Sequence, residues 1–205
     1  MANYPKRTTL AIAIAAALYG CGGGGVDPIP VTTSLTGVVV DGYLSGSTVF
    51  WDVNNNGIQD SGEPSSQTDS SGHFSLALFG TANQVNGAHL RIMGGTDTSV
   101  NEPFTHSMSV IIEDAANKPF VPITPLSSLI DAMVSSGAAA NITQARDSLA
   151  RVMGLSSAAA FDQDPLTQVI SEPTVLQKMV SIQKAMEVLA SADRTSAEGN
   201  PESVI

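Results

Sequence analysis

The chain has 205 residues, of which 42% are hydrophobic and 5% aromatic, enough for one medium-sized domain or two small ones with an aliphatic core. Its formal net charge of −10 at pH 7 repels nucleic acid and anionic lipid head groups, so the composition argues against a nucleic-acid-binding protein. Such a surface suits cations and extracellular or high-salt surroundings.

The start of the chain has the pattern of a secretory signal peptide. A short basic stretch precedes an apolar run over residues 10–18, which is far below the roughly 20 residues that a membrane-spanning helix needs. The run ends in Leu-Tyr-Gly-Cys, which resembles the lipobox of bacterial lipoproteins, although Tyr19 is bulkier than the usual residue there. The resemblance implies that residues 1–20 are removed and that Cys21 is lipidated. An ordinary signal peptide followed by a chance cysteine is the alternative.

Residues 21–33 are expected to form the lipidated cysteine and a flexible linker, because the stretch begins with four glycines after Cys21. Cys21 is the only cysteine, so the chain can form no internal disulfide. By resemblance to enteric lipoproteins, Gly22 stands where an aspartate would retain the protein at the inner membrane. The sequence therefore predicts a protein lipid-anchored to the bacterial outer membrane, at its periplasmic face or on the cell surface.

From residue 34 to residue 112 the pattern is that of short β-strands. Runs rich in β-branched and aromatic residues, such as LTGVVV and STVFWDV, alternate with turn-rich stretches, and HFSLALF, HLRIM and HSMSVII continue the series. No helical pattern separates these runs. The sequence therefore predicts a small antiparallel β-sandwich rather than a fold of alternating strands and helices.

A helical module is expected over residues 123–193, after a linker over residues 113–122. Thr124 and Pro125 suit the N-cap and first position of a helix that Gly137 would end. A second helix is expected to begin at an Asn141 or Thr143 cap and to end at Gly154.

A third helix is expected from about residue 174 to residue 192. Its apolar positions, Val175, Met179, Ile182, Met186 and Leu189, are spaced by 4, 3, 4 and 3 residues. This stripe is expected to pack against the two preceding helices, and the polar residues 194–205 are expected to be a flexible tail. The fold class is thus α+β: a small antiparallel β-sandwich followed by a C-terminal three-helix module.

Residues 52–63, DVNNNGIQDSGE, match the calcium-loop pattern D-x-[DN]-x-[DN]-G-x5-E. The predicted ligands are the side chains of Asp52, Asn54, Asn56, Asp60 and Glu63 and the backbone carbonyl of Ile58. Oxygen ligands alone suit Ca²⁺, whereas zinc would require histidine or thiolate. Without the ion the three carboxylates would repel one another, so we expect a loose metal-free loop. A polar hairpin that binds no metal is the alternative.

The flanks of this loop are strand-like, which argues against a helix–loop–helix calcium site. The stretch STVFWDVNNNGIQDSGEPSSQTDSSGHFSL resembles the B-type repeats and carboxypeptidase-regulatory-like sandwiches of bacterial surface proteins, over about residues 34–95. The resemblance implies an Ig- or prealbumin-like sandwich in which such an element binds calcium between two strands. The helical half resembles a segment that follows such sandwiches in adhesin-like surface proteins.

Signatures of common enzymes are missing: the sequence contains no G-x-S-x-G, no H-E-x-x-H and no phosphate-binding glycine loop. Asp162 and Asp164 could act as paired carboxylates, although a role in a turn is favoured. We therefore expect no enzymatic activity.

The expected function is that of a lipid-anchored bacterial surface protein with a calcium-stabilised sandwich and a structural or adhesive role. An extracellular lipoprotein that binds a glycan or a peptide is the alternative. Trp51, the only tryptophan, could stack on a sugar but is expected to pack in the core. The expected partners are the membrane, through the lipid, and an extracellular glycan or protein, but not nucleic acid.

Overall fold

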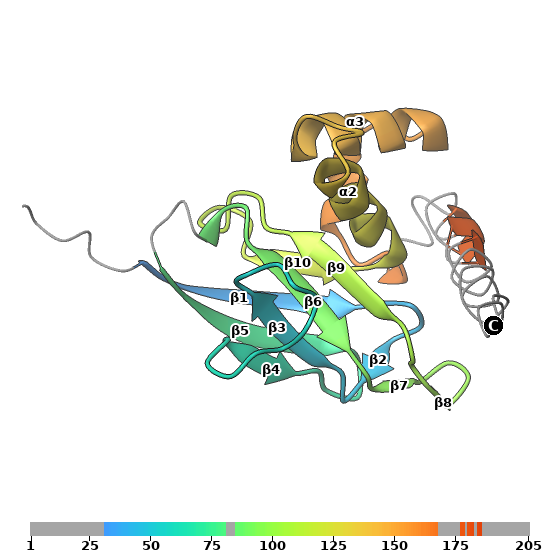
Figure 1. The fold of residues 1–205 in the computed structure, drawn as a ribbon. Coiled ribbons are helices and arrows are strands. Elements are labelled where there is room, and N and C mark those ends of the chain that lie inside the picture. The colour runs from blue at the N-terminus through green and yellow to red at the C-terminus, as the bar shows by residue number, and fades with distance from the viewer. Residues whose placement is uncertain (1–30, 81–84, 168–176, 179, 183, 186–205) are drawn as a thin grey trace, which may run out of the picture.

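The computed structural model describes residues 31–80, 85–167, 177–178, 180–182 and 184–185 (Figure 1). The strands are β1 (Val31–Val39), β2 (Leu44–Ser45), β3 (Thr48–Asp52), β4 (Ser65–Gln67), β5 (His73–Gly80), β6 (His89–Met93), β7 (Thr96–Asp97), β8 (Glu102–Pro103), β9 (Ser107–Ile111) and β10 (Phe120–Ile123). The helices are α2 (Pro125–Ser135), α3 (Ile142–Met153) and the 3-10 helix η1 (Ala158–Asp162). Among these described elements the helices follow the strands, which confirms the mixed α+β class.

Two larger sheets and one small sheet form the β part. One sheet has the order β4-β3-β6-β9 with antiparallel neighbours throughout, and the other has the order β10-β1-β5. Strand β1 runs antiparallel to β5 and parallel to β10. The small sheet β2-β7-β8 lies away from the helices in Figure 1. The arrangement is compatible with a small β-sandwich.

A hydrophobic core fills the space between the two larger sheets. It includes Leu35 and Val39 of β1, Leu76 and Leu78 of β5, Val49 and Trp51 of β3, and Leu90 and Ile92 of β6. These side chains occupy every second position of their strands or are four residues apart, as a sheet with one face in the core requires. Trp51 is 7% exposed and belongs to this core, which confirms its expected packing role.

The helices pack directly on the sandwich through a second hydrophobic cluster. The sheet contributes Val38 and Val40, at the end of β1, to this cluster. The residue between them, Val39, belongs to the sandwich core instead. The helices contribute Leu126 and Ile130 of α2 and Ala145, Leu149 and Met153 of α3. Because both faces of β1 are buried at its C-terminal end, at Val38 and Val39, this end of the strand links the sandwich core to the helical core.

The expected linker over residues 113–122 contains part of a strand. Residues Phe120–Ile123 form β10, whose Val121 and Ile123 are buried in the sandwich core. Pro122 obscures this strand in the sequence, because proline is tolerated in a sheet only near an edge. β10 is an edge strand of its sheet. At the other boundary, β1 begins at Val31, three residues before the expected start at residue 34 and inside the expected flexible linker.

The caps of the helices follow the sequence closely. Thr124 accepts a hydrogen bond from the Ser127 N–H, and the Ser127 hydroxyl accepts one from the Thr124 N–H, which confirms the expected start of α2. Asn141 rather than Thr143 caps α3, because its side chain accepts from the Gln144 N–H. Gly154 ends α3 with a φ of 67°, in the left-handed region that glycine adopts without strain.

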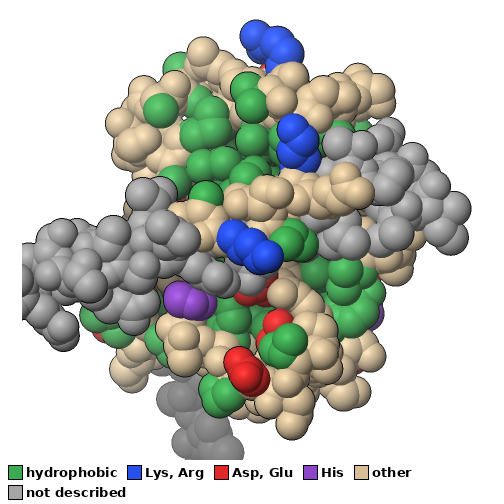
Figure 2. All heavy atoms as spheres, turned by 90° about the vertical axis from the view of Figure 1, so that its right-hand side faces the viewer, with side chains coloured by type: hydrophobic (Ala, Val, Ile, Leu, Met, Phe, Trp, Pro, Cys, Tyr) green, Lys and Arg blue, Asp and Glu red, His purple; other side chains and the backbone are tan. Residues whose placement is uncertain are grey.

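Part of the expected third helix is described. Residues 177–178, 180–182 and 184–185 are helical, and Ile182 packs against the second hydrophobic cluster. Val175, Met179, Met186 and Leu189 lie outside the described residues. Figure 2 shows hydrophobic side chains gathered over the helical part of one face. This part of the chain includes the half-buried Leu129, Met133, Val134 and Leu155.

Candidate metal centre

The predicted calcium loop connects β3 to β4. Asp52 is the last residue of β3, and its side chain is fully buried. The chain then turns outward, so that Val53 and Ile58 expose their side chains, and it rejoins the sheet at Ser65. All six predicted ligands therefore lie in one loop that starts from a rigid strand end.

Asp52 holds the first half of the loop in a tight curl. Its Oδ1 accepts a hydrogen bond of 3.0 Å from the Asn56 N–H, and its Oδ2 accepts one of 2.8 Å from the Gly57 N–H. The curl requires positive φ at Asn55 (56°) and Gly57 (81°), which asparagine and glycine accept more readily than other residues. The sequence pattern thus predicts the backbone course around Asp52 correctly.

Glu63 closes the loop from its other end. Its Oε1 accepts a hydrogen bond of 2.8 Å from the Val53 N–H, and its Oε2 accepts one of 3.0 Å from the Asp60 N–H. The carboxylate therefore lies between the beginning and the end of the loop. This is the place from which a glutamate at the last position would offer both oxygens to an ion.

The side chains of three further predicted ligands meet at one atom. Asp60 Oδ2 accepts hydrogen bonds from the side-chain amides of Asn54 and Asn56, each at 2.8 Å. The amide oxygens of the two asparagines accept from the N–H groups of Asn56 and Ile58, at 3.0 and 2.8 Å. Two positively polarised NH₂ groups thus surround the Asp60 carboxylate where a cation would be bound.

A residue that the sequence analysis missed contacts the loop. Arg91 of β6 donates from Nε to Asp52 Oδ2 at 2.5 Å and from Nη2 to Asn55 Oδ1 at 2.6 Å. Burial raises the pKa of Asp52, but hydrogen bonds from the Gly57 N–H and from Arg91 outweigh it and hold that pKa below its usual value. Internal hydrogen bonds and Arg91 therefore offset the repulsion between carboxylates on which our expectation of a loose metal-free loop rests, and that expectation stays a prediction. The sequence contains one hint of this contact. Arg91 stands between Leu90 and Ile92, two core residues of β6, so its side chain lies on the opposite face of the sheet from the core.

The chemistry of this loop fits calcium. Within the described residues, no group of three or more His, Cys, Asp or Glu side chains could hold a metal ion. The carboxylates of Asp52, Asp60 and Glu63 thus do not form such a group in this structure, and the predicted site also needs the two asparagine oxygens and the Ile58 carbonyl. A half-turn of an asparagine amide exchanges its nitrogen for its oxygen at the cost of the present hydrogen bonds. After that exchange Asn54 and Asn56 would present oxygens beside Asp60, a set of hard ligands that suits Ca²⁺.

An open groove of about 470 Å³ borders the loop. Its lining includes Trp51, Asp52, Val53, Phe79, Asn86 and His89. Phe79 is 60% exposed, whereas Trp51 presents only a small part of its surface. The groove therefore combines one exposed aromatic ring with several polar side chains.

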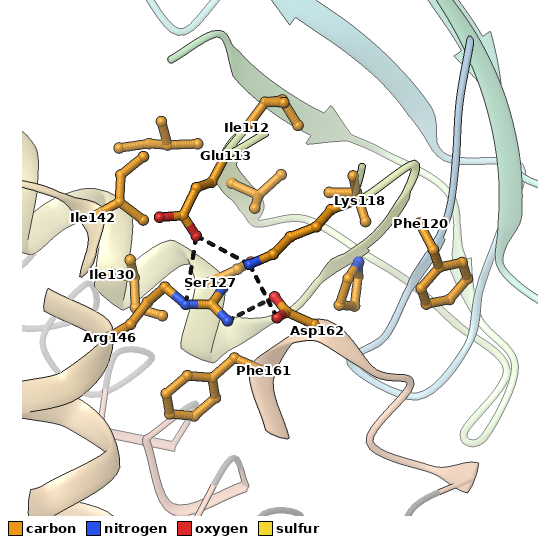
Figure 3. Close-up of a pocket in the computed structure, with 14 residues that line it drawn as sticks. Ile112, Glu113, Lys118, Phe120, Ser127, Ile130, Ile142, Arg146, Phe161 and Asp162 are labelled. Atoms are coloured by element: carbon orange, nitrogen blue, oxygen red, sulfur yellow. Dashed lines mark hydrogen bonds and ion pairs between the residues drawn. The ribbon is translucent and has the colours of Figure 1, made fainter. Parts of the chain in front are cut away.

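A second polar centre lies between the sandwich and the helices (Figure 3). Arg146 of α3 donates to Asp162 at 2.6 Å, and Lys118 lies 3.4 Å from both Asp162 and Glu113. The pocket beside these four charges has a volume of about 40 Å³, room for roughly one water molecule. The cluster therefore joins the segment before β10 to the helices.

Asp162 and Asp164 do not form a pair of catalytic carboxylates. Asp162 belongs to the ion pairs with Arg146 and Lys118. Asp164 accepts a hydrogen bond of 2.8 Å from the Tyr43 hydroxyl and one of 2.9 Å from the Leu166 N–H. Both carboxylates thus hold the turn after η1 in place, the role that the sequence analysis favoured.

His89 and Asp131 join the sandwich to α2. Nδ1 of His89 lies 3.2 Å from Oδ1 of Asp131, and Ser135 donates to the same carboxylate at 2.9 Å. Next to this pair, Ser128 of α2 accepts a hydrogen bond of 2.9 Å from the Ser109 N–H of β9. A partly buried contact to β6 and a buried one to β9 therefore fix α2 on the sheet.

No protein-family model matches the chain, and the search of curated proteins finds no match. In the described part of the chain, no helix combines the length and the apolar character needed to cross a membrane. Cys21, the predicted lipidation site, lies outside the described residues.

Proposed function

We propose that this protein is a lipid-anchored bacterial surface protein whose β-sandwich, of Ig- or prealbumin-like type, is stabilised by calcium, and that its role is structural or adhesive. The observation that carries the proposal is the loop over residues 52–63. It begins at a buried carboxylate, is closed by Glu63 and gathers Asn54, Asn56 and Asp60 at one point. Calcium bound there would tie β3 to β4.

The expected affinity is low. Extracellular modules of this ligand type bind calcium at roughly 10⁻⁴–10⁻³ M, and two neutral asparagines favour the weaker end of that range. At calcium about ten times the dissociation constant, linkage adds about 1.4 kcal/mol to the free energy of unfolding. For a domain of this size that corresponds to a rise of several degrees in melting temperature.

Melting scans of the full-length protein in detergent, with chelator, calcium or magnesium, test the proposal. Wild type should melt at a higher temperature in calcium than in chelator, and magnesium should have little effect because it demands octahedral geometry. Glu63→Gln should remove the calcium effect. Glu102→Gln, an exposed residue on β8 outside the loop, is the matched control and should keep it. Equal melting temperatures of wild type in calcium and chelator would refute calcium binding.

The lipid anchor requires its own test. Metabolic labelling with an alkyne analogue of palmitate should tag the wild type and not Cys21→Ser, because Cys21 is the only cysteine. Several acyl chains would hold the protein firmly, since a single chain binds membranes only marginally. Equal labelling of both proteins would contradict the lipoprotein assignment.

The groove beside the calcium loop favours a second candidate function, the binding of an extracellular glycan or peptide. A sugar ring or an apolar side chain could pack on Phe79, while Asn86 and His89 offer polar contacts. A glycan array probed with wild type and Phe79→Ala tests the glycan form of this candidate. Binding by wild type that the substitution abolishes would support it, and the absence of any bound glycan would leave the structural role.

A further inference from the structure

Arg91 occupies a fixed position beside the first residue of the calcium loop. In the antiparallel pair of β3 and β6, Asp52 lies opposite His89 and Phe50 lies opposite Arg91. Asp52 and Arg91 are therefore diagonal neighbours on one face of the sheet. The pairing of β3 with β6 fixes the backbone of Arg91, and from there its Nε donates to Asp52 Oδ2 at 2.5 Å.

The contact joins a buried carboxylate to a largely buried cation. The side chain of Asp52 is fully buried and that of Arg91 is 23% exposed. A buried carboxylate without a counter-ion is costly, so this pair offsets part of that cost, together with the Asn56 and Gly57 N–H groups that donate to Asp52. The second contact, from Nη2 to Asn55 Oδ1 at 2.6 Å, extends the guanidinium over the curl of the loop.

We propose that Arg91 is a built-in counter-ion of the calcium loop, which keeps the metal-free loop folded and lowers its calcium affinity. The inference rests on the calcium binding proposed above. Calcium bound to Asp52 has to share this carboxylate with a guanidinium, and the two cations repel each other. Arg91 thus sets the calcium concentration at which the loop changes from hydrogen bonds to metal ligands.

The sign of the effect separates this role from a merely structural one. If Arg91 only supported the fold, its loss would weaken both stability and calcium binding. As a competing cation, its loss lowers stability without calcium but increases the affinity for calcium. Removing a unit positive charge this close to a divalent ion should lower the dissociation constant by about tenfold or more.

Calorimetric calcium titrations and melting scans of the full-length protein in detergent test the proposal. Arg91→Gln removes the charge but keeps a hydrogen-bond donor, Arg91→Lys keeps the charge, and Arg151→Gln removes a charge from an exposed position on α3. We expect Arg91→Gln to bind calcium about tenfold more tightly than wild type and to melt earlier in chelator. Arg91→Lys and Arg151→Gln should stay within about threefold of the wild-type dissociation constant.

Calcium binding by Arg91→Gln that is equal to or weaker than that of wild type would overturn the proposal. If this variant does not fold, the Nε–H resonance of Arg91 in wild type decides the question. It should shift during a calcium titration together with the loop amides, and a constant Arg91 signal beside shifting loop amides would also overturn the proposal. A titration in which neither Arg91 nor the loop amides respond would refute calcium binding itself, and this inference with it.

Discussion

Replacing Asp131 by asparagine should loosen α2 from β6, because the Asp131 carboxylate carries the polar contacts between them. It lies 3.2 Å from Nδ1 of His89 and accepts a hydrogen bond of 2.9 Å from Ser135. Asparagine has nearly the same shape but no charge. The substitution therefore isolates the contribution of the ionised carboxylate.

The pKa of Asp131 gives the size of the effect. Burial raises it, but hydrogen bonds from His89, Ser109 and Ser135 outweigh burial and, with the electrostatic attraction of the His89 ring, lower it from 3.8 to about 2. At about 1.36 kcal/mol for each pKa unit, the difference corresponds to about 2 kcal/mol. Because the pKa is lower in the folded chain, this stabilisation is complete above the unfolded value of 3.8 and is lost as the pH falls through about 2.

Urea unfolding of the full-length protein, followed by tryptophan fluorescence, measures this effect. Trp51 is the only tryptophan and lies in the sandwich core, so its emission reports unfolding of the sandwich. Near neutral pH, Asp131→Asn should lower the free energy of unfolding by about 2 kcal/mol relative to wild type, and the difference should shrink between about pH 4 and about pH 2. Asp147→Asn, exposed on α3, is the matched control and should change stability by less than about 0.5 kcal/mol.

Two results would refute this reasoning. A difference between wild type and Asp131→Asn that stays constant down to about pH 2 would show that the ionisation of the carboxylate is not its source. A loss below about 0.5 kcal/mol near neutral pH would show that the Asp131 carboxylate contributes little to holding α2 on the sheet.

Two other substitutions test the contacts that hold the chain together, in the same urea assay. Tyr43→Phe should cost about 1–2 kcal/mol, because the buried Asp164 loses the hydroxyl that donates to it, and an unchanged stability would mean that water replaces the hydroxyl. Gly37→Ala should cost about 3 kcal/mol or more, because a Cβ would overlap the Val121 carbonyl oxygen and the Phe74 ring. A loss below about 1 kcal/mol would show that β1 and β10 can move apart there.

The sequence predicts the local features well because their causes are local. The run of β-branched and aromatic residues over Thr48–Trp51 predicts a strand, and Thr124 with Pro125 predicts the start of α2. The spacing of residues 52–63 places Asn54, Asn56 and Asp60 in one curl of the chain, where their side chains meet. Whether they bind calcium stays a prediction.

The features that the sequence did not predict depend on contacts between distant segments. Arg91 reaches Asp52 across a strand pair, 39 positions along the chain, so no motif contains both residues. Strand β10 has only four residues and includes a proline, and it forms because β1 offers it an edge. The docking of α2 on β9 likewise follows from Ser109 and Ser128 meeting in space.

The parallel pairing of β1 and β10 has a mechanical consequence. The chain enters β1 at Val31 and leaves β10 at Ile123, and parallel strands place these two points at opposite ends of the pair. Tension applied between the N-terminal side of the sandwich and the helices therefore loads the backbone hydrogen bonds of this pair in shear, all at once. Strands pulled apart from one end would instead lose their bonds one after another, at a lower force. A protein held by its N-terminal side and pulled through its helices would thus resist tension at this pair of strands.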